Sequence, residues 1–425
     1  MDNYNCQEDL QNIFVVPENS RQSLPYASNL DNNYRDVNGR YVPLLYKDFD
    51  FFAGQVLDLL PGRDQTFNDR KLLTLDLAKI YCHIRDAESD YKLVKRWSSR
   101  AAQLTNCNVY MQTSNDRVFN ASFCRVRLCP MCAWRRSLKI ALHTRKIITA
   151  MLEQSQGYRF VFATFTVPNV FDVDLDAMLD KMGKAWRRMT HLTKNTRPGS
   201  VPDRFNRSVC GWYRGLEITR NMDYYKMRYY RDKSGHKRKM PICNPGKYGF
   251  SLLNPWYKSY HPHYHCIMAV PQDYFRRDRG KYIDQQEWLN MWRWAMRDQS
   301  ITQVDVREIK PNPKIVKRYQ DAMSREQIQA LAVISAVEEA THYTVKSDDY
   351  IMDQDATRLL DLVLERRRLV AYGGVMADVR EQIKLDDEID GDLLVDGATP
   401  TEQDAVIKSY AFSVGFGRYI RIDNI

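Results

Sequence analysis

The sequence has no run of apolar residues that approaches the roughly 20 residues of a membrane-spanning helix. Its first residues are polar and include Asp2, Glu8 and Asp9, whereas a secretory signal starts with basic residues and continues with an apolar stretch. We therefore expect a cytoplasmic protein with no membrane partner.

The sequence also contains no glycine-rich motif of the kind that cradles nucleotide phosphates, and no internal repeat. An NTPase activity therefore has no support. The cysteines do not look like a disulfide framework either, because three of the nine lie close together between positions 124 and 132. Such clustering favours thiolate ligands in a reducing compartment.

Basic and aromatic residues are abundant. The 425 residues carry a formal net charge of +10, with 26 Tyr and 8 Trp. Positive charge favours a polyanionic partner and aromatic rings suit stacking on bases, although charge alone fits an acidic membrane surface equally well. Hydrophobic residues at 44% and charged residues at 27% are ordinary for a soluble folded chain, and the length allows two or three domains.

Residues 261–270 form the most informative stretch. The two-residue period of a β-strand puts His263 and His265 on one face together with Ile267 and Ala269. Three of the chain's eight histidines lie within five residues here, which is hard to explain by packing alone. Imidazole pairs at this spacing bind divalent metals. We interpret the pair as metal ligands; a structural histidine cluster is the alternative.

A carboxylate lies in the middle of another predicted strand, residues 211–219. Alternation puts Glu217 on the same face as Tyr213 and Thr219. Burying a carboxylate without a partner is costly, so Glu217 lies either on a solvated sheet face or beside a cation. If this strand lies beside the histidine strand, Glu217 completes a set of two histidines and one carboxylate with open positions for substrate oxygens.

A second cluster consists of Cys124, Cys129 and Cys132. Cysteines separated by two residues form the tight turn that binds zinc, and a structural zinc site needs four ligands. Cys107, on the far side of an apparent hairpin, is the predicted fourth ligand, and His143 is the second choice. Buried free cysteines are the alternative. A zinc ion would make this module fold around the metal.

Basic residues surround the cysteine cluster and recur in residues 223–260, which are dense in Lys, Arg and Tyr. We expect both groups to contact DNA, while a solvated surface and a solvated hairpin are the plainer explanations. The predicted DNA-binding residues are Arg125, Arg127, Arg135 and Arg136, with Lys139 beside them, and Lys237, Arg238 and Lys239.

A helix is predicted from the capping-box spacing at residues 324–327 onwards. Near its end, Glu339, Tyr343 and Lys346 share one face. A tyrosine on a helix is ordinarily a core or interface residue. Here a carboxylate one turn away can accept a proton and a lysine can stabilise phenolate or phosphate charge, which makes Tyr343 a candidate nucleophile.

Four motifs occur in a characteristic order along the chain. Residues 162–169, 216–219, 261–265 and 339–346 read FATFTVPN, LEIT, HPHYH and EATHYTVK. In these motifs the chain resembles the Rep_1 family of rolling-circle plasmid replication initiators, members of the HUH endonucleases with one catalytic tyrosine. The cysteine cluster with its following Trp-Arg-Arg, and Ala-Tyr-Gly-Gly at 371–374, resemble further segments of that family.

The resemblance implies an α+β fold with a central antiparallel sheet flanked by helices, and a metal on the sheet face beneath the tyrosine helix. It implies Mg²⁺ or Mn²⁺ held by His263, His265 and Glu217, with His261 as an alternative ligand. Tyr343 would attack the scissile phosphate of an exposed origin strand. The products would be a 5′-phosphotyrosine and a 3′-OH that primes the host polymerase.

The resemblance also implies further roles and partners. Glu339 would activate water for the terminating cleavage, and Lys346 would position the phosphate. Plasmid origin DNA, a host helicase and a host polymerase would be the partners, and a homodimer is an option. Structural Zn²⁺ would be the second cofactor.

Two other functions fit the same residues. Another HUH enzyme, a relaxase or a transposase, would use the same chemistry. The lack of a second tyrosine cluster and the spacing from Glu339 to Tyr343 argue against this alternative. A non-enzymatic, zinc-dependent DNA-binding regulator would use the histidines and Tyr343 structurally.

Four regions are expected along the chain. They are a disordered or weakly ordered N-terminus (1–45), a helical and cysteine-rich zinc module (46–150), an HUH-type nicking domain (151–350), and a C-terminal helical region with an acidic tail (351–425).

Overall fold

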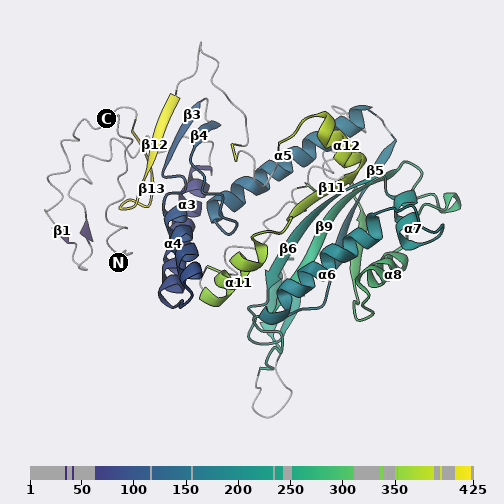
Figure 1. Cartoon of the computed structure of the whole chain (residues 1–425), viewed down its shortest axis with the longest axis horizontal. Coiled ribbons are helices and arrows are strands. Elements are labelled where there is room, and N and C mark those ends of the chain that lie inside the picture. The colour runs from purple at the N-terminus through teal and green to yellow at the C-terminus, as the bar shows by residue number, and fades with distance from the viewer. Residues whose placement is uncertain are drawn as a thin grey trace. The chain divides into compact units, whose positions relative to one another are not determined.

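A computed structural model of the chain shows two compact units. We call Met1–Cys124 with Asp396–Ile425 the N-terminal unit and Arg125–Val395 the central unit, and describe each by itself (Figure 1). The structure describes residues 34–35, 41–42, 63–114, 117–154, 157–232, 235–242, 251–310, 336–337, 340, 350–351, 353–386, 393–394 and 407–422.

The central unit is built on a five-stranded sheet in the order β10, β5, β9, β6, β11, and all neighbouring strands are antiparallel. Aromatic and β-branched residues are frequent in these strands, as suits a pleated surface packed on both sides. β9 is the middle strand, so both of its edges are hydrogen-bonded. The strands are β5 (Tyr158–Thr166), β6 (Gly211–Arg220), β9 (Tyr260–Pro271), β10 (Val304–Glu308) and β11 (Val370–Gly374).

One face of this sheet is covered by an aromatic core. Trp186 of α6 packs against Phe165 of β5 and Tyr264 of β9, with ring centroids 5.6 and 5.7 Å apart. Trp292 of α8 contacts Phe165 at 5.2 Å and donates its indole N–H to the Thr166 carbonyl at 2.8 Å. Large buried aromatic rings that pack edge to face fix this side of the sheet firmly. The helices are α6 (Asp172–Thr190), α7 (Val201–Ser208) and α8 (Gln285–Met296).

The opposite face is covered by α5 at the β11 end. Tyr372 of β11 lies across from Tyr213 of β6, and its hydroxyl is 3.0 Å from Oγ1 of Thr144 on α5. Because side chains alternate along a strand, Glu217 lies on the same face as Tyr213, four residues along β6. The helices at this end are α5 (Pro130–Gln154) and α12 (Val375–Gln382), while α11 (Gln354–Leu364) lies against α6.

Two smaller elements complete the central unit. A two-stranded ribbon of β7 (Met227–Arg231) and β8 (Lys237–Pro241) is inserted between β6 and β9, and it pairs with no other strand among the described residues. A short 3₁₀ helix, η3 (Arg277–Arg279), follows β9.

The N-terminal unit combines a helix pair with a four-stranded sheet in the order β13, β12, β3, β4. The C-terminal strand β12 thus returns to pair with β3, and β13 pairs with β12. The buried Lys71 of α3 donates to the carbonyls of Thr105 and Cys107 at 2.8 and 2.6 Å. The elements are β1 (Tyr34–Arg35), β2 (Tyr41–Val42), α3 (Arg63–Asp86), α4 (Tyr91–Thr105), β3 (Tyr110–Ser114), β4 (Arg117–Ala121), β12 (Ile407–Ser413) and β13 (Arg418–Arg421).

The predicted mixture of helices and antiparallel strands is confirmed. The apparent hairpin next to Cys107 is formed by β3 and β4, and the strands predicted at 211–219 and 261–270 are β6 and β9. Helix α5 begins at Pro130, between the last two cysteines of the cluster. Proline is favourable in the first turn of a helix because it lacks an N–H that would have no partner there.

Some expectations fall outside the described residues. They include most of residues 1–45, the helix predicted from residue 324, and most of the acidic tail. Among the helices that the structure describes, none combines the length and apolar character needed to cross a membrane.

Candidate functional site

Three polar side chains converge on the open part of the central sheet: Glu217 from β6, and His263 and His265 from β9. Glu217 pairs directly with His263 in the register of the two strands, while His265 pairs with Gly215. The ligand atoms of the three side chains all lie within 4.8 Å of one another. We call Glu217, His263 and His265 the ligand trio. The strand adjacency on which the sequence-based interpretation depended is therefore present.

The separations within the ligand trio suit a divalent metal. His265 Nε2 is 2.9 Å from Glu217 Oε2 and 3.1 Å from His263 Nε2, and His263 Nε2 is 3.5 Å from the same carboxylate oxygen. Ligands about 2.1 Å from an octahedral ion and at right angles to each other are about 3.0 Å apart. The trio therefore fits one face of an octahedral ion, with the other face left for substrate oxygens or water.

Hydrogen bonds on the far side of each ring prepare the Nε2 atoms for a cation. His263 Nδ1 lies 3.1 Å from the carbonyl oxygen of His261, and because a carbonyl only accepts, Nδ1 must donate. In the neutral ring this leaves a lone pair on Nε2. His265 Nδ1 lies 3.2 Å from Thr164 Oγ1 on β5, which can hold the same tautomer.

Electrostatics favour a cation at this point. Three groups that each offer a lone pair repel one another unless a proton or a metal ion lies between them. Burial alone would raise the pKa of Glu217, but hydrogen bonds and charge from His263 and His265 outweigh burial and hold that pKa well below its ordinary value of 4.5. The carboxylate is therefore ionised at neutral pH.

His261, the alternative ligand, lies on the same strand but outside the ligand trio. Its ring centroid is 5.4 Å from that of His263. Burial and the neighbouring His263 lower the pKa of His261. Its ring lines a cleft of about 520 Å³ that also reaches Thr164 and Gln303. The histidine end of the sheet thus opens into a polar cleft.

A glycine allows another segment to approach the ligand trio. Gly215 is on the same face of β6 as Glu217. A Cβ at Gly215 would lie 2.7 Å from Tyr213 Oη and 3.1 Å from the carbonyl oxygen of Ala340. Tyr213 Oη donates to that carbonyl at 3.3 Å. The Ala340 backbone therefore lies against β6 beside the trio.

The predicted nucleophile segment is described only in part. Ala340 is helical and buried, whereas Glu339, Tyr343 and Lys346 lie outside the described residues. Ala340 precedes Tyr343 by three positions.

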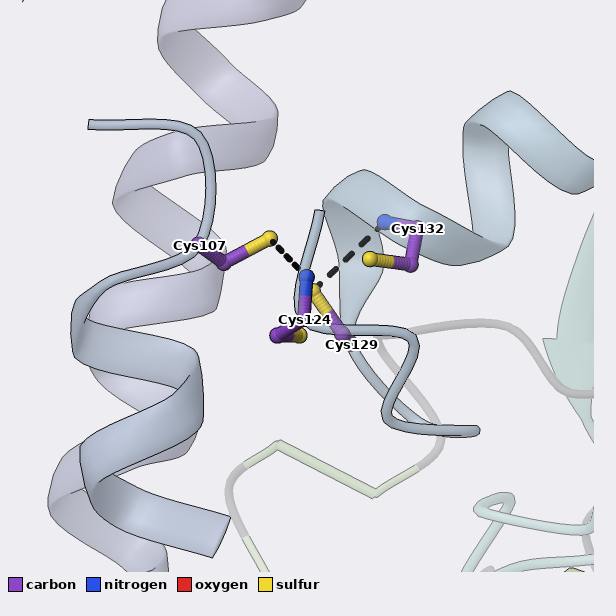
Figure 2. A group of neighbouring side chains, drawn as sticks. All are labelled: Cys107, Cys124, Cys129 and Cys132. Carbon is purple, nitrogen blue, oxygen red and sulfur yellow. Dashed lines mark hydrogen bonds between the residues drawn. The ribbon is translucent and has the colours of Figure 1, made fainter. Parts of the chain in front are cut away.

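The four predicted zinc ligands also converge, as Figure 2 shows around the start of α5. The Sγ atoms of Cys107, Cys124, Cys129 and Cys132 all lie within 4.8 Å of one another. Tetrahedral thiolates about 2.3 Å from zinc are about 3.8 Å apart, so this group fits a Cys₄ site after a small contraction. His143, the second choice for the fourth ligand, lies 3.5 Å from Asp386 instead.

Backbone N–H groups point at the cysteine sulfurs. The Cys124 N–H donates to Cys107 Sγ at 3.5 Å and the Cys132 N–H to Cys129 Sγ at 3.5 Å (Figure 2). The Arg125 N–H donates to Cys132 Sγ at 3.3 Å. Such bonds, and the helix N-terminus at Cys132, stabilise thiolates. Cys82 on α3 is different, because it is disulfide-bonded.

Strained backbone marks the same cluster. Asn108 and Arg125 have positive φ angles of 51° and 59°, and each directly follows a cysteine of the group. Left-handed conformations are unfavourable for residues other than glycine and persist where the surroundings require them. The turns therefore serve to aim the Cys107 and Cys124 side chains.

Several of the predicted DNA-binding residues are used inside the central unit. Arg136 is buried and donates to the carbonyls of Arg125 and Val126 at 2.7 and 3.3 Å. Arg135 is buried and donates to the Leu393 carbonyl at 3.1 Å. These guanidinium groups brace the turn after the cysteines. By contrast, Arg125, Arg238 and Lys239 are exposed.

Sequence reasoning missed Thr164 and Gly215 as parts of the site. Thr164 lies within the FATFTVPN motif, but its contact with His265 depends on the register of β5 against β9, where the two residues are paired. A glycine inside a strand is a signal for close approach of another backbone. That signal was available at Gly215.

Comparison with known proteins identifies the family. The sequence profile of Rep_1, described as a replication protein family, matches residues 115–419. The chain belongs to the Rep_1 family. This confirms the family expected from the four motifs, and membership in this group of plasmid replication initiators implies binding to origin DNA.

Individual Rep_1 relatives resemble most of the chain. A protein named Protein rep from Bacillus sp. is 30% identical over 311 residues, covering 70% of this chain and 85% of the relative. Protein rep of Bacillus amyloliquefaciens is 30% identical over 331 residues, covering 75% and 82%. Protein rep of Streptococcus pneumoniae serotype 2 is 26% identical over 336 residues, covering 78% and 84%. No solved structure matches the chain.

Proposed function

We propose that this chain initiates rolling-circle replication of a plasmid by making a site-specific, metal-dependent nick in one strand of its origin, with Tyr343 as the nucleophile. The observation that carries the proposal is the ligand trio. Its three lone-pair atoms, separated by 2.9 to 3.5 Å, have the spacing of one octahedral face. The HUH-endonuclease-like nature of the fold is part of this proposal.

The ligand trio would hold Mg²⁺ or Mn²⁺. A divalent ion bound there supplies positive charge that polarises the scissile phosphate. The chain's own contribution is to keep Glu217 ionised and to orient both Nε2 atoms toward the ion through the contacts at Nδ1. The cleft beside His261 gives a strand access to the same end of the sheet.

The contact of Ala340 with β6 supports Tyr343 as the nucleophile. Even a fully extended chain spans only about 11 Å in three residues. The Ala340 carbonyl accepts from Tyr213 beside Gly215, which itself pairs with His265. A phenol carried three positions further can therefore reach a phosphate held at the ligand trio.

In the proposed reaction, Tyr343 Oη attacks phosphorus in line with the leaving 3′ oxygen. The Oη–P bond forms and the P–O3′ bond breaks. The phenol proton passes to a base and the 3′ oxygen takes up a proton, which gives a 5′-phosphotyrosine and a 3′-OH primer. Lys346 would stabilise the phosphate charge, and Glu339 would activate water for the terminating cleavage.

The cysteine cluster would hold a structural Zn²⁺. Four thiolates leave no open position for a substrate, which is the usual arrangement at structural rather than catalytic zinc. Bound zinc would fix the turns at Asn108 and Arg125, whose positive φ angles need support.

A nicking assay tests the proposal. Supercoiled plasmid carrying the chain's own gene region is incubated with wild type, Tyr343→Phe or Tyr91→Phe, with Mg²⁺ or Mn²⁺ or with EDTA. Tyr91 is the control because it is an exposed tyrosine on α4. We expect open-circle product with wild type and Tyr91→Phe only when metal is present, and none with Tyr343→Phe. DNA binding without any metal-dependent nick would favour a non-enzymatic regulator.

A further inference from the structure

The β7–β8 ribbon extends directly from the two strands that carry the ligand trio. The chain leaves β6 after Arg220 and enters β9 at Tyr260, and the ribbon lies in the connection between them. Its base is anchored, because the Tyr224 ring contacts the Tyr257 ring at 5.2 Å and the Lys226 N–H donates to the Leu252 carbonyl at 2.8 Å. The ribbon is therefore an arm fixed to the catalytic end of the sheet.

Both faces of the ribbon are exposed. Tyr229 and Tyr230 are neighbours on β7 and so point to opposite faces, yet they are 70% and 45% exposed. Arg228, Arg238 and Met240 are exposed as well. An isolated two-stranded ribbon is marginal in water and gains little by exposing aromatic rings. Its side chains are therefore better explained by a partner than by the packing of this fold.

The ribbon carries an unusual share of the positive charge. Residues 227–241 contain six basic residues and one acidic residue, a net charge of +5, which is half of the chain's +10. So dense a charge, interleaved with tyrosines, is complementary to nucleic acid.

The two faces of the ribbon differ in chemistry. Tyr230 pairs with Arg238, and Arg228 pairs with Met240, on one face. The other face has Tyr229 paired with Lys239 and Arg231 paired with Lys237, and the Arg231 guanidinium already donates to the Gly235 carbonyl at 2.9 Å. Arginine can bind a guanine edge through two hydrogen bonds, whereas lysine serves as a point charge for phosphate. The first face is thus suited to bases and the second to the DNA backbone.

The basic side chains of the ribbon differ in whether they already form an ion pair. Lys239 pairs with Asp223, and Arg238 Nε lies 2.9 Å from Asp232. The Arg228 side chain has no hydrogen-bond or ion-pair partner among the described residues. Arg228 is therefore the cation on the base-reading face that can bind a new partner without breaking an existing pair.

We propose that the β7–β8 ribbon lies in the major groove of duplex origin DNA next to the nick site, with Arg228, Tyr230 and Arg238 facing the bases. This inference rests on the proposed nicking function, which needs origin DNA at the catalytic end of the sheet. The major groove, about 12 Å wide, admits a two-stranded ribbon. Arg228 and Tyr230 are about 7 Å apart along the strand, which matches two base-pair steps.

The test measures DNA binding by the full chain separately from nicking. DNase protection by wild type on the plasmid region carrying its gene defines a duplex of about 30 base pairs. Fluorescence anisotropy then compares this duplex, a shuffled duplex of the same composition and the matching single strand. Wild type is compared with Arg228→Ala, Lys239→Gln and Arg279→Ala, whose arginine is exposed on η3 away from the ribbon.

We expect Arg228→Ala to weaken binding to the protected duplex at least about fivefold, with less than a twofold change on the shuffled duplex. Lys239→Gln should weaken both duplexes alike and lower the slope of log affinity against log salt by about one. Arg279→Ala should match wild type. Unfolding temperatures of the variants check that each is folded.

Three results would overturn the inference. Equal losses by Arg228→Ala on both duplexes would mean that the ribbon reads no bases. A loss confined to the single strand would mean that the ribbon binds unpaired DNA, and unchanged affinities for all three probes would mean that it contacts no DNA. The nicking proposal fails separately: a protein that protects and reads its duplex but never nicks would keep the ribbon inference and lose the nuclease.

Discussion

Glu217 lies directly across from His263 in the register of β6 and β9, and its Oε2 is 2.9 Å from Nε2 of His265, the next histidine on that face. The ligand trio is therefore set by strand pairing. A shift of one residue in this pairing would turn Glu217 to the aromatic face and leave the histidines without a carboxylate.

Removing the Glu217 charge should weaken metal binding. Glu217→Gln keeps the size of the side chain but loses the anionic ligand, so we expect the affinity for Mn²⁺, measured by calorimetry, to fall at least about tenfold. Glu308→Gln is the matched control, because Glu308 of β10 pairs with Arg159 on the same sheet. Equal affinities for wild type and Glu217→Gln would remove Glu217 from the ligand set.

A methyl group at Gly215 should disturb catalysis more than metal binding. Gly215→Ala would put a Cβ 3.1 Å from the Ala340 carbonyl oxygen and displace that segment by a few tenths of an ångström. We expect the single-turnover nicking rate to fall about tenfold while Mn²⁺ affinity changes less than twofold. Gly183→Ala, where a Cβ meets nothing within 4 Å, should nick normally. Wild-type nicking by Gly215→Ala would show that this contact does not position the nucleophile.

Asp353 should make stability depend on pH. Burial alone would raise its pKa, but the Ala356 N–H and the Arg220 guanidinium, at 2.8 Å, outweigh burial and lower the pKa below its ordinary value of 3.8. Because folding favours the ionised form of Asp353, its charge stabilises the fold above about pH 3.8. This stabilisation is lost as the pH falls through the lowered pKa. Asp353→Asn keeps an oxygen to cap α11 but removes the negative charge that faces the buried Arg220 guanidinium.

We therefore expect Asp353→Asn to lower the free energy of unfolding by about 2 kcal/mol at pH 7, and by progressively less below pH 4. Urea unfolding from pH 3 to pH 7 measures the difference. Asp284→Asn is the control, because Asp284 caps α8 without an ion pair among the described residues. A difference that stays constant with pH would contradict the assignment.

The cysteine cluster should determine zinc content. Cys132→Ser removes one thiolate, so we expect bound zinc, measured by mass spectrometry of the metal, to fall from about one per chain to well below one, with a lower unfolding temperature. Cys210→Ser changes a free cysteine outside the cluster and should leave the zinc content unchanged. Zinc-free wild-type protein that unfolds at the same temperature with and without added zinc would contradict a structural metal.

The sequence predicted those features that depend on local pattern. Alternation alone placed His263 and His265 on one face, and cysteine spacing alone indicated the turn at Cys129 and Cys132. The pairing of Glu217 with His263 could be stated only as a condition, because register between strands more than 40 residues apart is a tertiary property.

Other features depend on packing between distant segments and had no local signal. Burial of Arg135 and Arg136 arises because their guanidinium groups meet backbone carbonyls, Arg135 that of Leu393 and Arg136 those of residues 125–127. The return of β12 to pair with β3 joins segments about 300 residues apart. A charged residue next to a motif looks the same in sequence whether it faces DNA or the protein interior.

The most direct test of the central claim is to identify the residue that becomes attached to DNA. Wild-type protein is incubated with single-stranded origin DNA and Mn²⁺, the covalent product is digested with trypsin and nuclease, and the modified peptide is sequenced by mass spectrometry. The account predicts a nucleotide joined through its 5′ phosphate to Tyr343, formed with Mn²⁺ and absent when Glu217 is changed to Gln or metal is chelated. Metal-dependent cleavage with no adduct, or an adduct on another residue, would contradict it.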